Sequence, residues 1–344
     1  MAAAGLMSIF GGARRVLSGS ARASDLFPQT KPDVDGEDCK HDCDSCTVKY
    51  PRHFKIEESH PLYGNIKPWS THVLVATSKS DWQKHIEHEE GSLMEAIDQA
   101  GKPSNGKLLL SASNMPTPSH RPDYSEPTRI LVLPAFTIVE NVTPPAVPSL
   151  IAKYISKAPT TSDPIEPFKL PTTISSSKSA VGDMTARPCP HRVVVLLCSH
   201  RTRDARCGQS APLIRKELER HLRPLGLDRD LDDERPGGVG VYFVDHVGGH
   251  KYSANMMVYR RPDAFGIDTI QRAKLPPGQE PQLVKPVDGD EGSDVGAGQC
   301  IWLARVRPED CENIVKYTIL QGKVVKAGKQ LRGGFDRSTG MMSW

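Results

Sequence analysis

The sequence predicts an α/β protein of two domains, and three observations lead to this expectation. The chain has 344 residues, more than a single hydrophobic core usually organises. Short apolar runs of strand length alternate along it with segments of helical character. Residues 157–190 are rich in Pro, Ser and Thr, as a linker between two domains would be.

The overall composition excludes several classes of protein. Lys and Arg number 44 against 41 Asp and Glu, and this net charge of +3 is too balanced for a nucleic-acid or membrane-surface binder. No apolar run approaches the ~18 residues that a membrane-spanning helix needs. The longest runs, at 130–136 and 193–198, have the length of strands instead. We therefore expect neither a nucleic-acid partner nor insertion into a membrane.

The N-terminal residues indicate an intracellular compartment. Residues 1–24 contain three arginines and several Ala and Ser, with no acidic residue before Asp25, which is the composition of a mitochondrial presequence. The alternative is a disordered tail on a cytoplasmic protein, so residues 1–30 are assigned to a presequence-like or disordered tail. Because thiols stay reduced in either compartment, clustered cysteines here indicate metal ligands or redox groups rather than structural disulfides.

The first domain is expected at residues 70–156, after an irregular, cysteine-rich segment at 31–69. Three apolar runs predict strands, and two segments predict helices, of which the longer begins after Ser80 and stops at Gly101. This alternation is typical of a small α/β domain. The strands are expected at 72–77, 107–111 and 129–136, and the helices at 81–100 and 148–156.

The second domain is expected at residues 191–335, with an insertion rich in Pro, Gly and acidic residues at 276–299 and a C-terminal tail at 336–344. Its elements follow the order strand, helix, strand, strand, strand, helix, which is the skeleton of a thioredoxin-like α/β domain, although several other folds share it. No internal repeat is clear in the sequence. The strands are expected at 192–198, 239–245, 254–259 and 300–306, and the helices at 210–221 and 308–320.

Two cysteines and two histidines in the second domain are candidate metal ligands. Cys198 and Cys207 are nine residues apart, His246 and His250 are four apart, and each pair follows a predicted buried strand. On a strand, four residues span roughly 13 Å, which is too far for one metal ion, and the two glycines between the histidines disfavour a helix. A Gly-Gly turn remains, and it would let both imidazoles converge. The four residues therefore predict a metal site.

Two thiolates and two imidazoles suit either zinc or an iron–sulfur cluster. The eight residues between the cysteines make a wide loop for a structural zinc site, whereas a two-iron cluster needs ligands that wrap a larger object. The fragment Cys198-Ser199-His200 resembles half of a Rieske motif, but Cys207 is followed by Gly-Gln-Ser and does not complete it. The residues thus exclude a Rieske site and leave zinc and an iron–sulfur cluster open.

Two longer motifs around these residues resemble the signatures of the sucrase/ferredoxin-like family. They are Cys-Ser-His-Arg-Thr-Arg-Asp-Ala-Arg-Cys-Gly at 198–208 and His-Val-Gly-Gly-His-Lys-Tyr-Ser-Ala-Asn at 246–255, and a weaker likeness extends to 43–51. The resemblance implies an α/β protein whose C-terminal domain is a thioredoxin-like ferredoxin with a 2Fe–2S cluster, preceded by the smaller α/β domain.

On that resemblance, Cys198 and Cys207 would hold one iron of the cluster, and His246 and His250 the other. Neutral imidazoles in place of thiolates make a cluster less negative and raise its reduction potential. We expect a one-electron carrier or redox sensor, with thiol redox homeostasis as a candidate process, rather than a catalyst with its own substrate, and no catalytic residue is assigned. The alternative is a zinc-stabilised binding or scaffold protein without redox activity.

A second group of cysteines lies near the N-terminus. Cys39, Cys43 and Cys46, with His41 among them, fall within eight residues. Three interpretations stay open: a small zinc site, a Cys43–Cys46 dithiol, or an acidic segment whose cysteines are incidental. The surrounding acidic residues would raise the thiol pKa values, which disfavours a highly reactive thiol.

The C-terminal residues indicate a partner. Met342-Ser343-Trp344 is similar to the tail by which some cytosolic iron–sulfur clients engage their assembly machinery. This interpretation conflicts with a presequence, because a matrix protein would receive its cluster inside the organelle. We expect a mitochondrial location, with the cytoplasm as the alternative, and two partners: the iron–sulfur assembly machinery and a redox partner protein that the sequence does not identify.

Overall fold

The computed structural model describes residues 21–124, 126–175, 182–262, 264–265 and 294–344. Most of the expected presequence at 1–24 and of the expected insertion at 276–299 therefore lies outside the described residues. The described part is an α/β fold, as predicted, with one large mixed sheet of 13 strands and several helices. Among the described helices, none combines the length and the apolar character needed to cross a membrane.

The first half of the sheet contains the strands before residue 190. The parallel pair β1 and β2 lies beside β3 and β4, which continue the sheet in antiparallel fashion. Two short strands, β5 and β6, follow on the outer edge. The elements are β1 (Thr71–Ala76), α3 (Leu93–Gln99), β2 (Leu108–Ser113), β3 (Thr128–Leu133), β4 (Thr137–Val142), α4 (Val147–Lys153), β5 (Thr173–Ile174) and β6 (Met184–Pro188).

The second half of the sheet contains the strands after residue 190. Strands β7 and β9 are parallel, and β10 to β13 continue from β7 in antiparallel order. The elements are β7 (Val193–Cys198), α5 (Ala205–Leu222), β8 (Asp228–Arg229), β9 (Val239–Val244), β10 (Met256–Arg260), β11 (Gln299–Leu303), α7 (Cys311–Asn313) with the π-helical turn Ile314–Ile319, α8 (Ala327–Gln330), β12 (Leu331–Asp336) and β13 (Met341–Met342).

The two halves repeat one topology. The first runs β1, α3, β2, β3, β4, α4, and its strands lie in the order β2-β1-β3-β4. The second runs β7, α5, β9, β10, β11, α7, and its strands lie in the order β9-β7-β10-β11. The thioredoxin-like order predicted for the second half is thus present in both halves, although the sequence shows no clear repeat.

A short seam between β2 and β9 joins the halves into one sheet. Ser113 of β2 pairs antiparallel with Val244 of β9. Next to this pair, the backbone N–H of Asn114 donates to the carbonyl of Phe243 at 3.1 Å, and the side-chain oxygen of Asn114 accepts from the Phe243 N–H at 2.7 Å. These bonds join the two halves at the carboxyl-terminal ends of β2 and β9.

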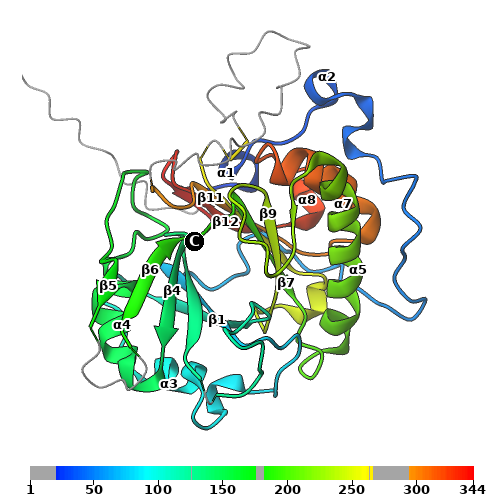
Figure 1. Cartoon of the computed structure of the whole chain (residues 1–344). Coiled ribbons are helices and arrows are strands. Elements are labelled where there is room, and N and C mark those ends of the chain that lie inside the picture. Colours follow the sequence, from blue (N-terminus) through cyan, green and yellow to red (C-terminus); the bar gives the residue numbers. More distant parts are fainter. Residues whose placement is uncertain (1–20, 125, 176–181, 263, 266–293) are drawn as a thin grey trace, which may run out of the picture.

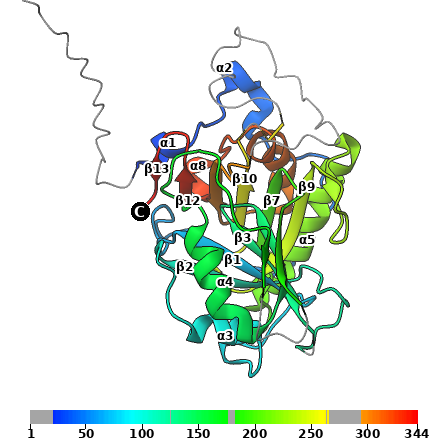
Figure 2. The ribbon, with the colours of Figure 1, turned by 60° about the vertical axis from the view of Figure 1, so that its left-hand side comes forward.

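The two halves of the sheet face each other across a shared core, and helices cover their outer faces. The molecule therefore has four layers: helices, second half, first half, helices. Alternate residues of β7 face opposite sides: Val193 and Val195 pack toward α5 and α7, whereas Val194 and Leu196 pack toward the strands of the first half. Figure 1 shows α5 and α7 on one side of the strands and α3 and α4 on the other, and Figure 2 shows α4 in front of the strands of the first half. The apolar side chains between the two halves of the sheet therefore form the centre of the protein.

The N-terminal segment packs on the second half. Within the predicted tail at 1–30, α1 (Ala23–Leu26) is helical, and Leu26 and Phe27 are buried in the core beneath the second half of the sheet. After α2 (Pro32–Asp35), the chain is mostly irregular up to β1, as predicted for 31–69. Residues 21–30 are thus part of the fold, which corrects the prediction of a tail there.

Two other segments are more ordered than predicted. The expected linker at 157–190 contains β5 and β6, which extend the first half of the sheet by pairing with β4 and with each other. The expected C-terminal tail at 336–344 contains β13, which pairs with β12. Strands of two to five residues are too short to carry a periodic signal, so composition made both segments resemble loops.

Two predicted elements of the first half have different ends. The helix predicted at 81–100 forms only from Leu93, because Gly91 has a positive φ of 75° and Ser92 caps the new helix through a bond to the Glu95 N–H. The strand predicted at 129–136 is a hairpin, in which a turn after Leu133 starts β4. The continuous apolar run concealed that turn.

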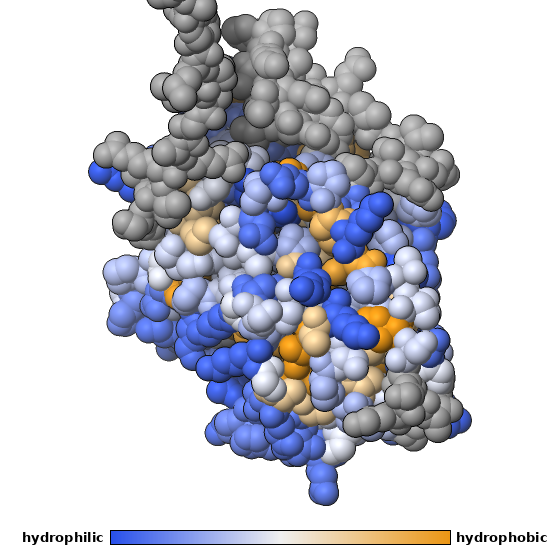
Figure 3. Space-filling model, turned by 90° about the vertical axis from the view of Figure 1, so that its left-hand side faces the viewer, coloured by the Kyte–Doolittle hydropathy of each residue, from blue (hydrophilic) through white to orange (hydrophobic). Residues whose placement is uncertain are grey.

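The outer surface of the first half is mixed in character. Among the described residues, the large hydrophobic side chains that are exposed are Val34 and Tyr124. In Figure 3, which faces the left-hand side of the view in Figure 1, apolar residues appear in small patches between polar ones. This surface does not mark a large apolar interface.

Candidate metal centre

The four predicted ligands lie at one edge of the second half of the sheet. Cys198 is the last residue of β7, and Cys207 lies in the first turns of α5. His246 and His250 belong to the loop that follows β9. Because β7 and β9 are parallel neighbours, their carboxyl ends meet at the same edge, and the loops that follow them converge there.

Three of the four residues meet closely. One ligand atom from each of Cys198, Cys207 and His250 lies within 4.8 Å of the others. Within this group, the Cys207 Sγ is 3.7 Å from the His250 Nδ1. The His246 ring stacks on the His250 ring, with 3.6 Å between the ring centroids and 16° between the planes. The structure therefore brings all four residues to one place, with His246 beside the closest three.

The Gly-Gly turn predicted between the histidines is present. Gly248 and Gly249 have positive φ values of 88° and 68°, which reverse the chain and bring the two rings together. A Cβ atom on Gly249 would lie 2.8 Å from the nearest nitrogen of the Arg332 guanidinium. A side chain at position 249 is thus disfavoured by both the backbone angle and the space.

Arg332 fixes this turn through hydrogen bonds, and no local pattern in the sequence marks it. Its guanidinium donates to the carbonyl of Gly248 at 2.9 Å, to the Asn255 side chain at 2.9 Å and to the carbonyl of Asn65 at 2.9 Å. Burial lowers the pKa of Arg332 to about 10, but this value is still well above neutral pH, so the guanidinium stays positively charged. It comes from β12, far along the chain, which is why spacing could not reveal it.

The electrostatics of the donor atoms suit metal binding. A hydrogen bond between the two thiols lowers the pKa of Cys207, to about 6, and raises that of Cys198. Cys207 therefore gives up its proton first and is held as a thiolate, also through contacts with His250 and Ser253. Burial lowers the pKa of His246 to about 3, so its imidazole is neutral, the form that binds metals.

The loop after Cys198 attaches to the first half of the protein. The Ser199 hydroxyl donates to the carbonyl of Ser80 at 2.7 Å, and the His200 Nε2 lies 3.0 Å from the carbonyl of Trp82. His200 is therefore engaged in holding the two halves together and stands outside the donor group. The residues between Cys198 and Cys207 therefore also position the site, because they attach this loop to the first half of the protein.

A buried carboxyl group precedes the first histidine, and sequence reasoning missed it. Asp245 is 6% exposed and ends the seam between the halves, where its backbone N–H donates to the Ala112 carbonyl at 3.0 Å. Burial raises its pKa to about 8, so the carboxyl group is largely protonated at neutral pH. An acidic residue directly after an apolar strand is the signal that could have marked it.

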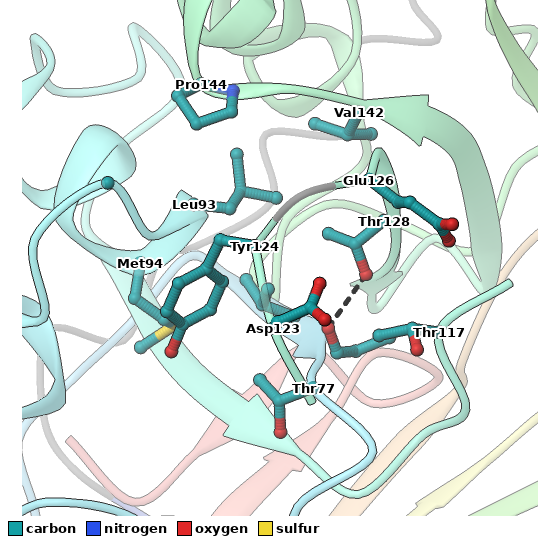
Figure 4. A pocket seen from close by; sticks show the side chains of 13 residues that line it. Thr77, Leu93, Met94, Thr117, Asp123, Tyr124, Glu126, Thr128, Val142 and Pro144 are labelled. Carbon is teal, nitrogen blue, oxygen red and sulfur yellow. Dashed lines mark hydrogen bonds between the residues drawn. The ribbon is translucent and has the colours of Figure 1, made fainter. Parts of the chain in front are cut away.

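The corresponding end of the first half carries a different pocket. Figure 4 shows it between the end of β1 and the start of α3, with Tyr124, Asp123 and Thr128 around it. The Thr128 hydroxyl donates to the carbonyl of Ala76, the last residue of β1, at 2.8 Å. Among the described residues, those that line this pocket include neither cysteine nor histidine.

The N-terminal cysteines are separated in the structure. Cys39 is buried against Tyr317 and Val325, whereas Cys43 and Cys46 are half-buried. The His41 side chain lies 3.3 Å from Asp38 at the surface. The four residues predicted as a possible zinc site are therefore not gathered around one point.

Comparison with known proteins identifies similar chains. The family model described as sucrase/ferredoxin-like matches residues 62–333. Actin patches distal protein 1 of Saccharomyces cerevisiae is 33% identical over 236 residues, which are 65% of this chain and 71% of that protein. Altered inheritance of mitochondria protein 32 of Clavispora lusitaniae is 27% identical over 180 residues, 52% of this chain and 50% of that protein. No solved structure matches the chain.

Proposed function

The chain belongs to the sucrase/ferredoxin-like family, and from this premise we propose that it is an iron–sulfur redox protein that carries a 2Fe–2S cluster and acts as a one-electron carrier or redox sensor. The observation that carries the proposal is the convergence of two thiols and two imidazoles at the carboxyl ends of β7 and β9. This donor set matches the one that mixed Cys/His clusters use.

In this proposal Cys198 and Cys207 hold one iron, and His246 and His250 hold the other. When bound, the cluster supplies a one-electron couple whose potential the neutral imidazoles raise above that of an all-cysteine ferredoxin. The chain supplies the rest: the lowered pKa of Cys207 favours its thiolate, Arg332 fixes the histidine turn, and the Ser253 hydroxyl contacts the Cys207 sulfur at 3.6 Å.

The distribution of donors supports a cluster over a single zinc ion. A zinc site places four donors tetrahedrally around one point. Here three donor atoms lie within 4.8 Å of one another, and His246 stands beside this group, stacked on His250. Four donors that do not surround a single point fit a cluster with two iron atoms better than one zinc ion.

The location and partners are proposed on narrower grounds. A mitochondrial location agrees with the name of the relatives called altered inheritance of mitochondria protein 32, while actin patches distal protein 1 leaves the cytoplasm as the alternative.

For assembly of the cluster, we propose recognition of the C-terminal tail by the iron–sulfur assembly machinery. The Trp344 ring packs against that of Trp69, with 4.5 Å between the ring centroids and 37° between the planes, so this tail lies against the fold. The redox partner would approach the histidine loop, where Lys251 is exposed.

An EPR spectrum of the reduced protein, recorded across pH with a parallel metal analysis, tests the proposal. The expected result is a brown protein that bleaches on dithionite and then gives the signal of a reduced 2Fe–2S centre. A colourless protein that holds zinc at the cysteines of β7 and α5 would overturn it and favour the zinc-stabilised scaffold. In addition, His250→Cys should keep the cluster and lower its potential, because a thiolate makes it more negative.

A further inference from the structure

A second group of metal-type donors forms around one N-terminal cysteine. The Cys43 sulfur, a ring nitrogen of His221 and a carboxylate oxygen of Glu312 lie within 4.8 Å of one another. We propose that Cys43, His221 and Glu312 bind a zinc ion, with Cys46 as the fourth ligand. This site is independent of the proposed function, because it shares no residue with the Cys198 group.

The three donors come from separate parts of the chain that the fold brings together. His221 lies in the last turn of α5, Glu312 in α7, and Cys43 in the irregular N-terminal segment. The His221 Nε2 is 4.0 Å from the Cys43 sulfur, so the nitrogen faces the thiol. The Cys43 backbone N–H donates to the carbonyl of Glu309 at 2.9 Å, which fixes the cysteine beside α7.

Cys46 is the further thiol of the same turn: its sulfur lies outside the group of three and donates to the Val48 carbonyl at 3.3 Å, a bond that it would exchange for the metal. Its backbone N–H donates to the carbonyl of Cys43 at 3.2 Å, which closes a turn around Asp44 and Ser45. Two cysteines separated by two residues in such a turn are the usual cysteine pair of a structural zinc site. Burial raises the pKa of Cys46, so this thiol is not a reactive thiolate by itself, and it would release its proton to solvent on binding a metal.

The surrounding charge favours a cation. The carboxylate of Asp44 lies in the same segment and Glu309 precedes α7, whereas Asp42 is already paired with Lys326. The carboxyl end of α5, where His221 lies, adds the negative end of a helix dipole. Burial, helped by the neighbouring Arg220, lowers the pKa of His221, so its imidazole is neutral and able to bind zinc.

Arg220 is the cation nearest to the site and must be accounted for. Its guanidinium is 3.4 Å from the Cys43 sulfur and 3.0 Å from the His221 Nε2. The same group pairs with the buried Glu217 at 2.8 Å and reaches the Ser45 hydroxyl at 3.2 Å. These two bonds can keep Arg220 in place while zinc takes the His221 nitrogen, and its charge is already balanced by Glu217.

The site lies too far from the Cys198 group to share its metal. Cys207 and His221 are in the first and last turns of the same helix, 14 residues apart, and the helical rise of 1.5 Å per residue separates them by about 21 Å. A zinc ion here would link the N-terminal segment to α5 and α7. Its role is to stabilise the fold, as in other structural zinc sites.

Metal analysis of the intact holoprotein tests this proposal. Protein purified without chelators should contain stoichiometric zinc in addition to its iron, and a chromogenic chelator titrated against it should report the zinc affinity. His221→Ala should weaken zinc binding more than about 100-fold, since even the loss of a residue that only supports a ligand costs 10–100-fold. The iron content should stay unchanged.

Two matched variants make the result decisive. His41→Ala removes the histidine that is closest to Cys43 in sequence but lies outside the donor group, so it should leave the zinc affinity unchanged. Arg220→Gln removes the competing cation and should leave zinc binding equal or tighter. A protein that lacks zinc and holds a Cys43–Cys46 disulfide, or loses its zinc in His41→Ala but not in His221→Ala, overturns the proposal.

Discussion

The two halves of the sheet share one topology and differ in what they place at the same edge. In the second half, β7 ends in Cys198, and β9 is followed by Asp245 and His246. In the first half, β1 ends in Ala76, and β2 is followed by Asn114. The first half keeps a pocket lined by apolar side chains together with hydroxyl and carboxyl groups, where the second half gathers thiols and imidazoles.

The difference shows that the fold supplies a position and the loops supply the chemistry. Both halves bring the ends of two parallel strands together, so either could present donors to a metal. The loop of the second half is nevertheless fastened to the first, through Ser199 and His200. The half without donors therefore acts as a support for the half with them.

Removing a cluster ligand should have the largest effect on iron binding, and only ligands in the second half should have this effect. Cys207→Ala is expected to abolish iron binding, because one iron would keep a single protein ligand. The measurement is iron content and visible absorbance of the purified variant. Cys300→Ala is the control: it changes an equally buried thiol in the core between the halves and should retain the iron content and the visible absorbance. If Cys207→Ala also kept its iron, Cys207 would not be a ligand.

Arg332→Gln should weaken the site without removing a ligand. The change removes the guanidinium that donates to the Gly248 carbonyl and the Asn255 side chain, so the histidine turn becomes mobile. Iron release to a chelator is therefore expected to accelerate roughly 10–100-fold. Arg337→Gln is the matched control, because this buried guanidinium donates to carbonyls away from the histidine turn, such as that of Ala297. Equal release rates in the two variants would assign Arg332 a purely structural role.

Asn114→Ala should destabilise the seam between the halves. The change leaves the buried N–H of Phe243 without its acceptor, at a cost of about 1–3 kcal/mol in the free energy of unfolding. Chemical denaturation measures it. Asn313→Ala, which removes an exposed bond to the His41 carbonyl, should cost less, and the reverse order would mean that the seam adds little to stability.

His72 should make stability depend on pH through the contact between the halves. Its Nδ1 lies 2.9 Å from the Tyr259 hydroxyl of the opposite half, and burial lowers its pKa to about 3 from 6.5. Between these values the unfolded chain binds a proton that the folded chain does not. Stability therefore falls as the pH drops below 6.5, by up to about 1.4 kcal/mol per pH unit from this residue.

His72→Gln tests that dependence by comparison of slopes. The free energy of unfolding, measured between pH 7 and pH 5, should fall less steeply in the variant than in the unchanged protein. The buried Asp245 contributes a slope of opposite sign in both proteins, because its pKa is raised, so only the difference between the slopes is diagnostic. Identical slopes would show that His72 is not kept neutral by the fold.

The sequence predicted the parts of the site that depend on local pattern. The apolar run before Cys198, the glycine pair between the histidines and the order of elements in the second half are all local or sequential features, and the structure has each of them. Arg332 and Asn65 reach the histidine turn from distant parts of the chain, and no spacing rule connects them to it.

The repeat and the seam were also beyond sequence reasoning, for a physical reason. A topology depends on where apolar residues fall along strands, and many residue types satisfy that requirement, so Val73 and Val195 can play similar roles without any similarity between their motifs. The predicted division at 157–190 rested on composition, whereas contacts such as that of Asn114 with Phe243 arise only when the halves meet.

The shared core has a consequence for anyone who wants a minimal version of this protein. Cutting the chain before β7 would expose one whole face of the second half, including Leu196, Tyr259 and Trp302, which the first half now covers. It would also uncover the free end of β9 at the seam. The fragment with every proposed cluster ligand would thus be prone to aggregation, and a small soluble ferredoxin from this sequence would need that face redesigned with polar residues.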